Sequence, residues 1–348
     1  MSYTTKQVNI GGVLVGGGAP VTVQSMLNVR ADDIDGNVKQ AVELEAAGCQ
    51  ILRVSVPNSA AVALISDIKN AVKIPLVADI HFDYRLALAS VAAGIDKIRI
   101  NPGNIGEASR VKEVAMACNL HNVPIRIGVN SGSVEKEILA KYGSPTAEAL
   151  VESAEHHISL LHKYDFNDIV VSIKASNVQT MIAAYRLMSQ RHNYPLHLGV
   201  TEAGTERMGL IKSAIGIGSL LCDGIGDTIR VSLTADPVKE IAAAKDILRG
   251  LNISDKGIRF TSCPTCGRTN IDLIGLANKV EKALENCSKN LSVAIMGCAV
   301  NGPGEAREAD IGVAGGIGEG LIFKKGKALR KVPEDQIVDE LLREIENM

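Results

Sequence analysis

The stretch Val123–Asn130, VPIRIGVN, decides the fold. It is a short run rich in β-branched residues that ends in a polar tip, and amphipathic helical sequence follows it. The same succession recurs eight times between Val21 and Gly250, which predicts eight β-α units. The strand-like runs are VTVQSM, ILRVSV, IPLVADIH, KIRINPG, VPIRIGVN, IVVSIKAS, LHLGVTEAG and TIRVSLT, and they begin at Val21, Ile51, Ile74, Lys97, Val123, Ile169, Leu196 and Thr228.

The segments between these runs are typical of amphipathic helices. In 58–72 and 146–164, apolar residues recur at i, i+3, i+4 and i+7 after an opening Asn or Thr. The last helix is expected to have Pro237 in its first turn and to close on Gly250.

Eight β-α units in about 230 residues match a (β/α)8 TIM barrel in number and size. A doubly wound sheet usually has fewer strands and a glycine-rich phosphate turn after its first strand. No such turn follows VTVQSM. The glycines of GGVLVGGG (11–18) precede that strand instead, and they predict a hairpin that closes the bottom of the barrel.

Charged and polar residues interrupt the strands near their carboxyl ends, although buried parallel strands are usually almost continuous apolar runs. Residues two apart on a strand point the same way, and one of these directions in a barrel is the lumen. Barrel enzymes place their chemistry at the C-terminal mouth. The residues predicted there are Arg53, Asp79, His81, Arg99, Asn101, Arg126, Asn130, Lys174, Ser176, Arg230 and Ser232.

The charge of this predicted mouth is unbalanced, because Asp79 and Glu202 are its only evident acids. Its five cations are Arg53, Arg99, Arg126, Lys174 and Arg230. Burying an unpaired charge costs several kcal/mol, so an excess of about three positive charges indicates an anionic ligand. Converging arginines favour more than one phosphoryl group. The alternative is that each cation belongs to a structural ion pair.

The composition argues against several other functions. The 348 residues are 46% hydrophobic with a formal net charge of -2, so no overall basic field favours nucleic acid. Aromatic residues make up 3% and Trp is absent, which disfavours base stacking. No apolar run reaches the roughly 18 residues of a membrane span, and the N-terminal sequence does not resemble a signal peptide. Seven cysteines, an odd number, favour a reducing cytoplasm over a disulfide framework.

The β-α repeat stops after RGLNISDKG (249–257), which predicts a barrel domain over 1–254 and a small α/β domain over 255–348. In the second domain we expect a helix from about Asp272 to Cys287, strands in LSVAIMG and ADIGVAGG, a polar hairpin through LIFKKGKALRKV and a closing helix in EDQIVDELLREIENM.

Four cysteines of the second domain suggest a metal centre. Cys263 and Cys266 form a Cys-x-x-Cys pair in SCPTCGR, and Cys298 precedes the turn-forming NGPGE. A zinc site needs four ligands and the domain has no histidine. A redox dithiol formed by the Cys-x-x-Cys pair would have no need of Cys298. Cys287 is interpreted as a small buried thiol, and the alternative is that it is the fourth metal ligand. Three thiolates with Glu305 as a weaker ligand suit a [4Fe–4S] cluster that has one exchangeable position.

SCPTCGR and MGCAVNGPGE, together with the barrel motifs VADIHFD, KIRINPGN, IRIGVNSGS and GVTEAG, closely resemble the family of the 4-hydroxy-3-methylbut-2-enyl diphosphate synthases. These are bacterial iron–sulfur enzymes of the methylerythritol phosphate route to isoprenoids. The resemblance covers essentially the whole chain, in the two-domain form of the family.

The resemblance implies a reaction and a set of site residues. The family's substrate is 2-C-methylerythritol 2,4-cyclodiphosphate, whose ring is opened and a hydroxyl reductively removed with two electrons from flavodoxin or ferredoxin. The implied cluster ligands are Cys263, Cys266, Cys298 and Glu305. Glu202 would handle protons, and Asn301 would orient the substrate at the cluster. The implied substrate-binding residues are Arg53, Asp79, His81, Arg99, Arg126, Asn130, Lys174, Arg230 and Asn301.

The family also implies a head-to-tail homodimer, in which each cluster domain caps the partner's barrel mouth. The linker LNISDKG (251–257) extends at most about 25 Å, whereas the helix before it already descends about 20 Å. A cluster domain would therefore reach a partner's mouth more readily than its own.

Two alternatives belong to other functional classes. One is a phosphate-binding barrel with a redox-sensing or electron-carrying cluster domain that performs no reductive dehydration. The other is a pterin-type transferase barrel with a structural metal domain.

Overall fold

A computed structural model of the chain describes residues 4–105, 107–253, 257–285, 287, 289–298 and 306–348. The chain folds into two compact units, Met1–Leu251 and Asn252–Met348. The division lies close to the boundary after residue 254 that the sequence predicts.

The first unit is a (β/α)8 TIM barrel, which confirms the predicted fold. In the described residues, eight parallel strands pair in the order β8-β7-β6-β5-β4-β3-β10-β9, and a parallel bridge between Val171 and Leu196 closes the ring. The last two strands are shorter than predicted, so Arg230 lies just beyond β10. The strands are β3 (Thr22–Met26), β4 (Ile51–Ser55), β5 (Leu76–Asp79), β6 (Lys97–Ile100), β7 (Ile125–Asn130), β8 (Ile169–Lys174), β9 (His197–Leu198) and β10 (Thr228–Ile229).

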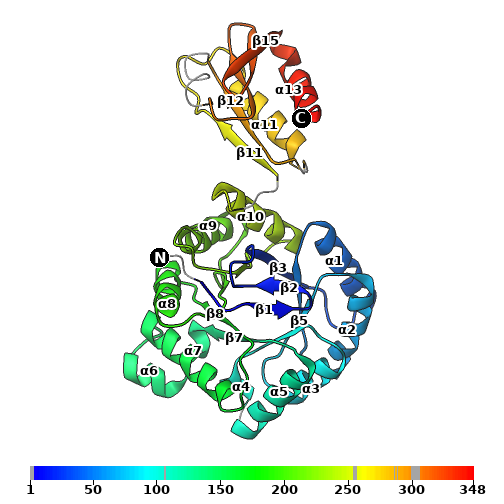
Figure 1. Cartoon of the computed structure of the whole chain (residues 1–348), viewed down its shortest axis with the longest axis vertical. Helices are drawn as coiled ribbons and strands as arrows, with labels where there is room; N and C mark the ends of the chain where they lie inside the picture. Colours follow the sequence, from blue (N-terminus) through cyan, green and yellow to red (C-terminus); the bar gives the residue numbers. More distant parts are fainter. Residues whose placement is uncertain (1–3, 106, 254–256, 286, 288, 299–305) are drawn as a thin grey trace. The chain divides into compact units, whose positions relative to one another are not determined.

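Helices surround the strands as an outer ring (Figure 1). Asn58 and Thr146 cap their helices by accepting hydrogen bonds from backbone N–H groups, as the sequence indicates. In the described residues no helix is long and apolar enough to cross a membrane. The helices of the ring are α1 (Ile34–Ala46), α2 (Ser59–Ala71), α3 (Tyr84–Ala92), α5 (Ala108–His121), α7 (Ala147–His162), α8 (Val178–Arg191), α9 (Glu206–Cys222) and α10 (Pro237–Gly250). Shorter elements in the connections are α4 (Pro102–Ile105), η1 (Ser131–Ser133) and α6 (Lys136–Tyr142).

The predicted hairpin before the first barrel strand is present. Strands β1 (Val8–Ile10) and β2 (Val13–Val15) pair antiparallel around Gly11 and Gly12, whose φ angles of 54° and 94° suit glycine. The hairpin packs on residues near the amino ends of barrel strands and covers the bottom of the barrel (Figure 1). This apolar cluster consists of Val8, Ile10, Val15, Ile51, Val77 and Val170.

The second unit is a five-stranded sheet in the described residues, in the order β11-β12-β13-β14-β15. Its first three strands are parallel and its last two form an antiparallel hairpin. The described α-helices at Leu273–Leu284 and Ile337–Glu346 pack on one face of the sheet through a core that includes Val280, Val313 and Leu341. The elements are β11 (Ile258–Ser262), α11 (Leu273–Leu284), β12 (Leu291–Met296), β13 (Ile311–Gly315), β14 (Glu319–Lys324), β15 (Lys327–Pro333), η2 (Glu334–Gln336) and α13 (Ile337–Glu346).

Candidate functional site

Asp79, at the end of β5, is the centre of a buried ion cluster in the barrel lumen. Its side chain accepts hydrogen bonds from Arg53 Nη2 and, at 3.2 Å, from Arg99 Nη1. His81 Nε2 lies 3.5 Å from the same carboxylate. Burial alone would raise the pKa of Asp79, but the adjacent guanidinium groups outweigh it and hold this pKa well below its ordinary value. Asp79 is therefore an anion at neutral pH, and two arginines share it.

The Arg99 side chain passes close to Gly128 on the neighbouring strand β7. A Cβ atom at Gly128 would lie 2.3 Å from Arg99 Nε, so only glycine leaves room for the guanidinium. Arg99 Nη2 donates to the Gly128 carbonyl at 3.3 Å. With its amide oriented to suit its neighbours, Asn130 accepts a further bond from Arg99 Nη2 at 3.1 Å. These contacts fix the guanidinium at the mouth.

Arg230 has a carboxylate partner that the sequence reasoning missed. Its guanidinium lies 3.3 Å from Glu240 Oε2, and this buried acid comes from α10. Glu240 also accepts a hydrogen bond from Leu233 N at 2.9 Å. The second acid expected among the strand-end cations was Glu202, but Glu202 is exposed. Glu240, six positions beyond the strand run Thr228–Thr234, is thus an additional acid that reaches the lumen from a helix.

Arg126 and Lys174 are the buried cations of the predicted set that have no ion pair among the described residues. Arg126 is 1% exposed, and burial together with Arg53 and Arg99 lowers its pKa. Burial also lowers the pKa of Lys174, and the charge of Arg230 lowers it further. Lys174 Nζ would be 3.0 Å from a Cβ atom at Gly199, so this second glycine also makes room for a cation.

Sequence reasoning also missed a deeper polar layer. Lys97, Gln24 and His197 point into the lumen and are at most 1% exposed. Lys97 precedes Arg99 by two residues on β6, so the two side chains point to the same side of the strand. This spacing could have identified Lys97 as a lumen residue from the sequence. Six basic side chains now share the lumen with two buried carboxylates in the described residues. The cations are Arg53, Lys97, Arg99, Arg126, Lys174 and Arg230, and the acids are Asp79 and Glu240.

Glu202 is held in an unusual backbone conformation. Its φ of 51° lies in the left-handed region, which non-glycine residues seldom occupy. It follows β9 and its side chain is exposed. Strain of this kind is concentrated at functional sites, where the surrounding structure maintains it.

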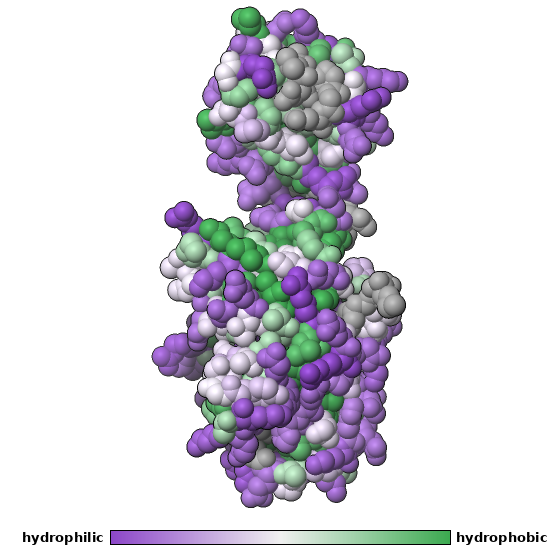
Figure 2. Space-filling model, turned by 90° about the vertical axis from the view of Figure 1, so that its left-hand side faces the viewer, coloured by the Kyte–Doolittle hydropathy of each residue, from purple (hydrophilic) through white to green (hydrophobic). Residues whose placement is uncertain are grey.

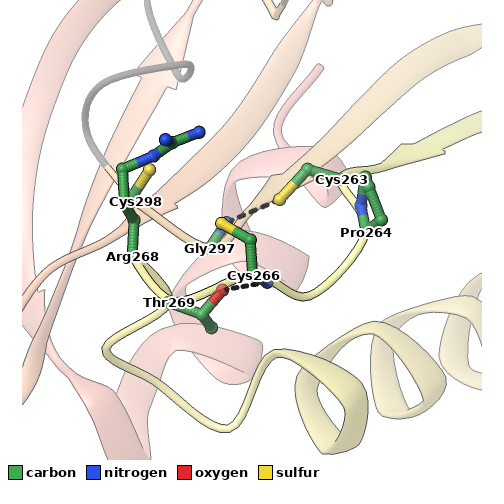
Figure 3. A pocket seen from close by; sticks show the side chains of 7 residues that line it. All are labelled: Cys263, Pro264, Cys266, Arg268, Thr269, Gly297 and Cys298. Atoms are coloured by element: carbon green, nitrogen blue, oxygen red, sulfur yellow. Dashed lines mark hydrogen bonds between the residues drawn. The ribbon is translucent and has the colours of Figure 1, made fainter.

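In the second unit, three cysteines from two segments line one cavity of about 170 Å³. Cys263 and Cys266 follow β11, and Cys298 follows β12; their sulfur atoms come together around the cavity (Figure 3). The parallel pairing of these strands explains the meeting, since both segments leave the same edge of the sheet. Among the described residues, no three His, Cys, Asp or Glu side chains form a group that could hold a single metal ion.

The backbone of this cavity supports a thiolate-bound group. Gly297 N donates to Cys263 Sγ at 3.1 Å, and hydrogen bonds of this type tune iron–sulfur clusters. Cys266 N donates to Thr269 Oγ1 at 3.3 Å, which fixes the turn between them. Arg268 adds a positive side chain to the lining. The donor set therefore fits an anionic cluster bound by sulfur.

The remaining sequence-predicted ligands have different outcomes. Cys287 packs against the core between the sheet and its helices and is not among the residues that line the cavity. Its side chain is half-buried there. Glu305 and Asn301 lie outside the described residues.

Two family descriptions match the chain. Residues 5–245 match the GcpE TIM-barrel domain, and residues 259–347 match the GcpE protein C-terminal domain. A Clostridium perfringens protein named 4-hydroxy-3-methylbut-2-en-1-yl diphosphate synthase (flavodoxin) is 59% identical over 344 residues, which is 99% of each chain. A Geobacter sulfurreducens protein of the same name is 55% identical over 348 residues, covering 100% of this chain and 99% of the relative.

Two solved structures match a share of the chain that corresponds to the length of the barrel. Dihydropteroate synthase from Xanthomonas albilineans matches 71% of this chain and 97% of its own, with a TM-score of 0.53 and 15% identity. 3-Dehydroquinate dehydratase from Geobacillus kaustophilus matches 72% of this chain and 98% of its own, with a TM-score of 0.54 and 16% identity. These likenesses concern the fold, whereas the sequence relatives extend over both units. The chain belongs to the GcpE family, that of the 4-hydroxy-3-methylbut-2-en-1-yl diphosphate synthases.

Proposed function

We propose that the chain catalyses the reductive ring opening and dehydration of 2-C-methyl-D-erythritol 2,4-cyclodiphosphate to 4-hydroxy-3-methylbut-2-enyl diphosphate in isoprenoid biosynthesis. Membership of the GcpE family over both units supports this reaction. The observation that carries it in the structure is the excess of buried cations in the lumen, because such an excess requires an anionic ligand. The pterin-type alternative shares only the barrel with this chain, at 15% identity.

The lumen residues divide into two groups by their present partners. Arg53, Arg99 and Arg230 already contact carboxylates, so their free N–H groups would position the substrate while their charge is partly balanced. Arg126 and Lys174 have no carboxylate partner among the described residues, and the diphosphate would balance them. Asp79, His81 and Asn130 hold the arginines or hydrogen-bond the substrate beside them.

We propose that Cys263, Cys266, Cys298 and Glu305 hold a [4Fe–4S] cluster. Bound there, the cluster would pass the two electrons of the reaction from the external donor to the substrate, one at a time. Glu305 would be the exchangeable ligand, because a carboxylate binds more weakly than a thiolate. The chain's own contribution is to bring the three thiolates together around one cavity and to donate Gly297 N–H to Cys263. Asn301 would orient the substrate beside this cavity.

Glu202 is proposed to supply a proton as the substrate's hydroxyl leaves as water. Its exposed position after β9 leaves the carboxyl free to exchange protons with solvent. The left-handed backbone conformation of Glu202 fixes the point from which its side chain projects, whereas a flexible loop would not.

Flavodoxin is the expected electron donor because the relatives carry it in their names, with ferredoxin as the alternative. We place the reaction in the cytoplasm, since a thiolate-bound cluster needs reducing surroundings and no disulfide joins the described cysteines.

We propose a homodimer with composite sites. Met208, Ile211 and Ile215 are exposed on one side of α9, and Figure 2 shows apolar residues gathered on the upper part of the barrel side that carries α8 and α9. Exposed apolar surface of this kind marks an interface, and a second copy of the chain is the proposed occupant.

Mixing inactive Glu202→Gln and Cys298→Ser proteins should then restore activity through mixed dimers. Demonstrated subunit exchange without recovered activity would disprove composite sites.

The test of the reaction is an anaerobic assay with the cyclodiphosphate and reduced flavodoxin. We expect product formation by a brown protein with about four irons per chain. Arg126→Ala should weaken substrate binding strongly while the barrel stays folded. One zinc per chain and no turnover would refute the proposal.

A further inference from the structure

Lys97 is enclosed in the barrel lumen without a hydrogen-bonding partner. It is the first residue of β6, and its Cα is paired with Val77, whose side chain contacts the β1–β2 hairpin. Ile98 and Ile100 on the other face of β6 pack in the outer core, so Lys97 points inward with Arg99. The side chain is 0% exposed, and its Nζ atom has no hydrogen-bond partner in the described residues. Lysine is almost never buried in this way unless it is paired.

The charged groups that act on Lys97 are cations. Arg126 from β7 and Arg53 from β4 are its charged neighbours, and His197 from β9 interacts with the same group. Asp79, a carboxylate of the lumen, is already engaged by Arg53 and Arg99. Burial lowers the pKa of Lys97 well below its ordinary value, and the charges of Arg126 and Arg53 lower it further. In the free protein the protonated form of Lys97 is therefore disfavoured, because the amine is fully buried, has no hydrogen-bonding partner in the described residues and lies among cations.

Packing alone does not explain a lysine at this position. TIM barrels fill their lumen with layers of branched aliphatic side chains, which need no partner. Gln24 of β3 and His197 of β9 also have buried side-chain atoms without a hydrogen-bonding partner in the described residues. Buried polar groups that share the lumen with a cluster of cations are suited to sensing charge that arrives at the mouth.

We propose that Lys97 is a binding residue of the second layer, and that it takes up a proton when the doubly negative cyclodiphosphate enters the mouth. The dianion reverses the local field that keeps the amine neutral, and the ammonium then adds to the attraction for the ligand. Affinity for the substrate is therefore coupled to proton uptake. This inference rests on the proposed substrate, and its first step, ligand binding, is measured separately from proton uptake.

The experiment is titration calorimetry of the oxidised, cluster-loaded protein with the cyclodiphosphate, without an electron donor. Runs near pH 7.5 in two buffers of different ionisation enthalpy give the number of protons taken up. The phosphates of the ligand are strongly acidic and take up none themselves. We expect the wild-type protein to take up close to one proton per chain, so its affinity falls up to about tenfold for each unit rise in pH.

Lys97→Met should bind the ligand with little proton uptake and an affinity nearly independent of pH. Its free form should melt at a higher temperature than wild type, because an unpaired buried amine has been removed. Lys39→Met, on the exposed surface of α1, is the matched control and should behave as wild type. Lys97→Gln serves as the test variant if the methionine protein does not fold.

The possible results separate the two proposals. Absence of ligand binding by the wild-type protein would overturn the proposed substrate together with this inference. Normal binding with undiminished proton uptake in both Lys97 variants would overturn the inference alone and would assign the proton to His197 or Lys174. Loss of uptake in these variants, with the control unchanged, would support it.

Discussion

Replacement of Asp79 by Asn tests how far one carboxylate stabilises the barrel. Asp79 is 2% exposed and accepts charged hydrogen bonds from Arg53 and Arg99. Such bonds contribute about 1.5–3 kcal/mol each, and removing one partner of a buried ion pair costs about 3–5 kcal/mol. An asparagine fills the same volume but leaves both guanidinium groups without an anion. We therefore expect Asp79→Asn to lower the free energy of unfolding by about 3–5 kcal/mol.

Urea unfolding followed by far-UV circular dichroism measures this difference. Asp32→Asn is the control, because Asp32 pairs with Arg30 on the exposed surface, and no measurable loss is expected there. The lowered pKa of Asp79 means that the folded protein keeps this carboxylate charged below the pH at which the unfolded chain protonates it. Its contribution is complete above about pH 4 and falls as the pH drops further. A variant as stable as wild type at pH 7 would refute the ion-cluster reasoning.

Three further predictions concern the other parts of the site. Gly128→Ala should displace Arg99, since the new Cβ atom would lie 2.3 Å from Arg99 Nε, and calorimetry should show substrate binding weakened roughly tenfold to a hundredfold. Glu202→Gly should retain full stability in urea, whereas Glu202→Val should lose about 1–2 kcal/mol, because a left-handed φ of 51° suits glycine and opposes a β-branched residue. Cys298→Ser should lose most of the bound iron, as measured by metal analysis, whereas Cys287→Ser should keep it, because Cys287 packs in the core. Equal loss in both cysteine variants would contradict the ligand assignment.

The sequence is informative wherever a feature depends on near neighbours in the chain. Helix α10 begins at Pro237 and ends at Gly250 as expected, because its end signals are local. The two-residue period of the strands correctly identified the lumen-facing side of β6 and β7. Strand length was harder to predict from the sequence. The run from Leu196 suggests a long strand, but β9 contains two residues. Pairing depends on where the neighbouring strands present their backbone groups, which a single run does not contain.

Ion-pair partners depend on distances that periodicity does not encode. Glu240 lies ten residues from Arg230 on a different element, and it reaches the lumen only because α10 packs against the first barrel strand. Lys97 shares a face with Arg99, but periodicity gives the direction of a side chain and not its depth in the barrel. The roles of Gly128 and Gly199 could not be recognised from the sequence either, because each glycine leaves space for a cation from another strand.

The arrangement of charge also explains why the lumen is not built like an aliphatic core. Replacing buried ion pairs by apolar residues is often neutral or stabilising, so a barrel selected for stability alone would not retain Arg126 or Lys97 in this position. Both are fully buried and neither has a carboxylate partner among the described residues. The cost of burying them is recovered only when an anion occupies the mouth, because Arg126 and a newly protonated Lys97 then attract a ligand that water would otherwise solvate. The lumen is thus a preorganised site whose strain in the free protein is part of its affinity for a diphosphate.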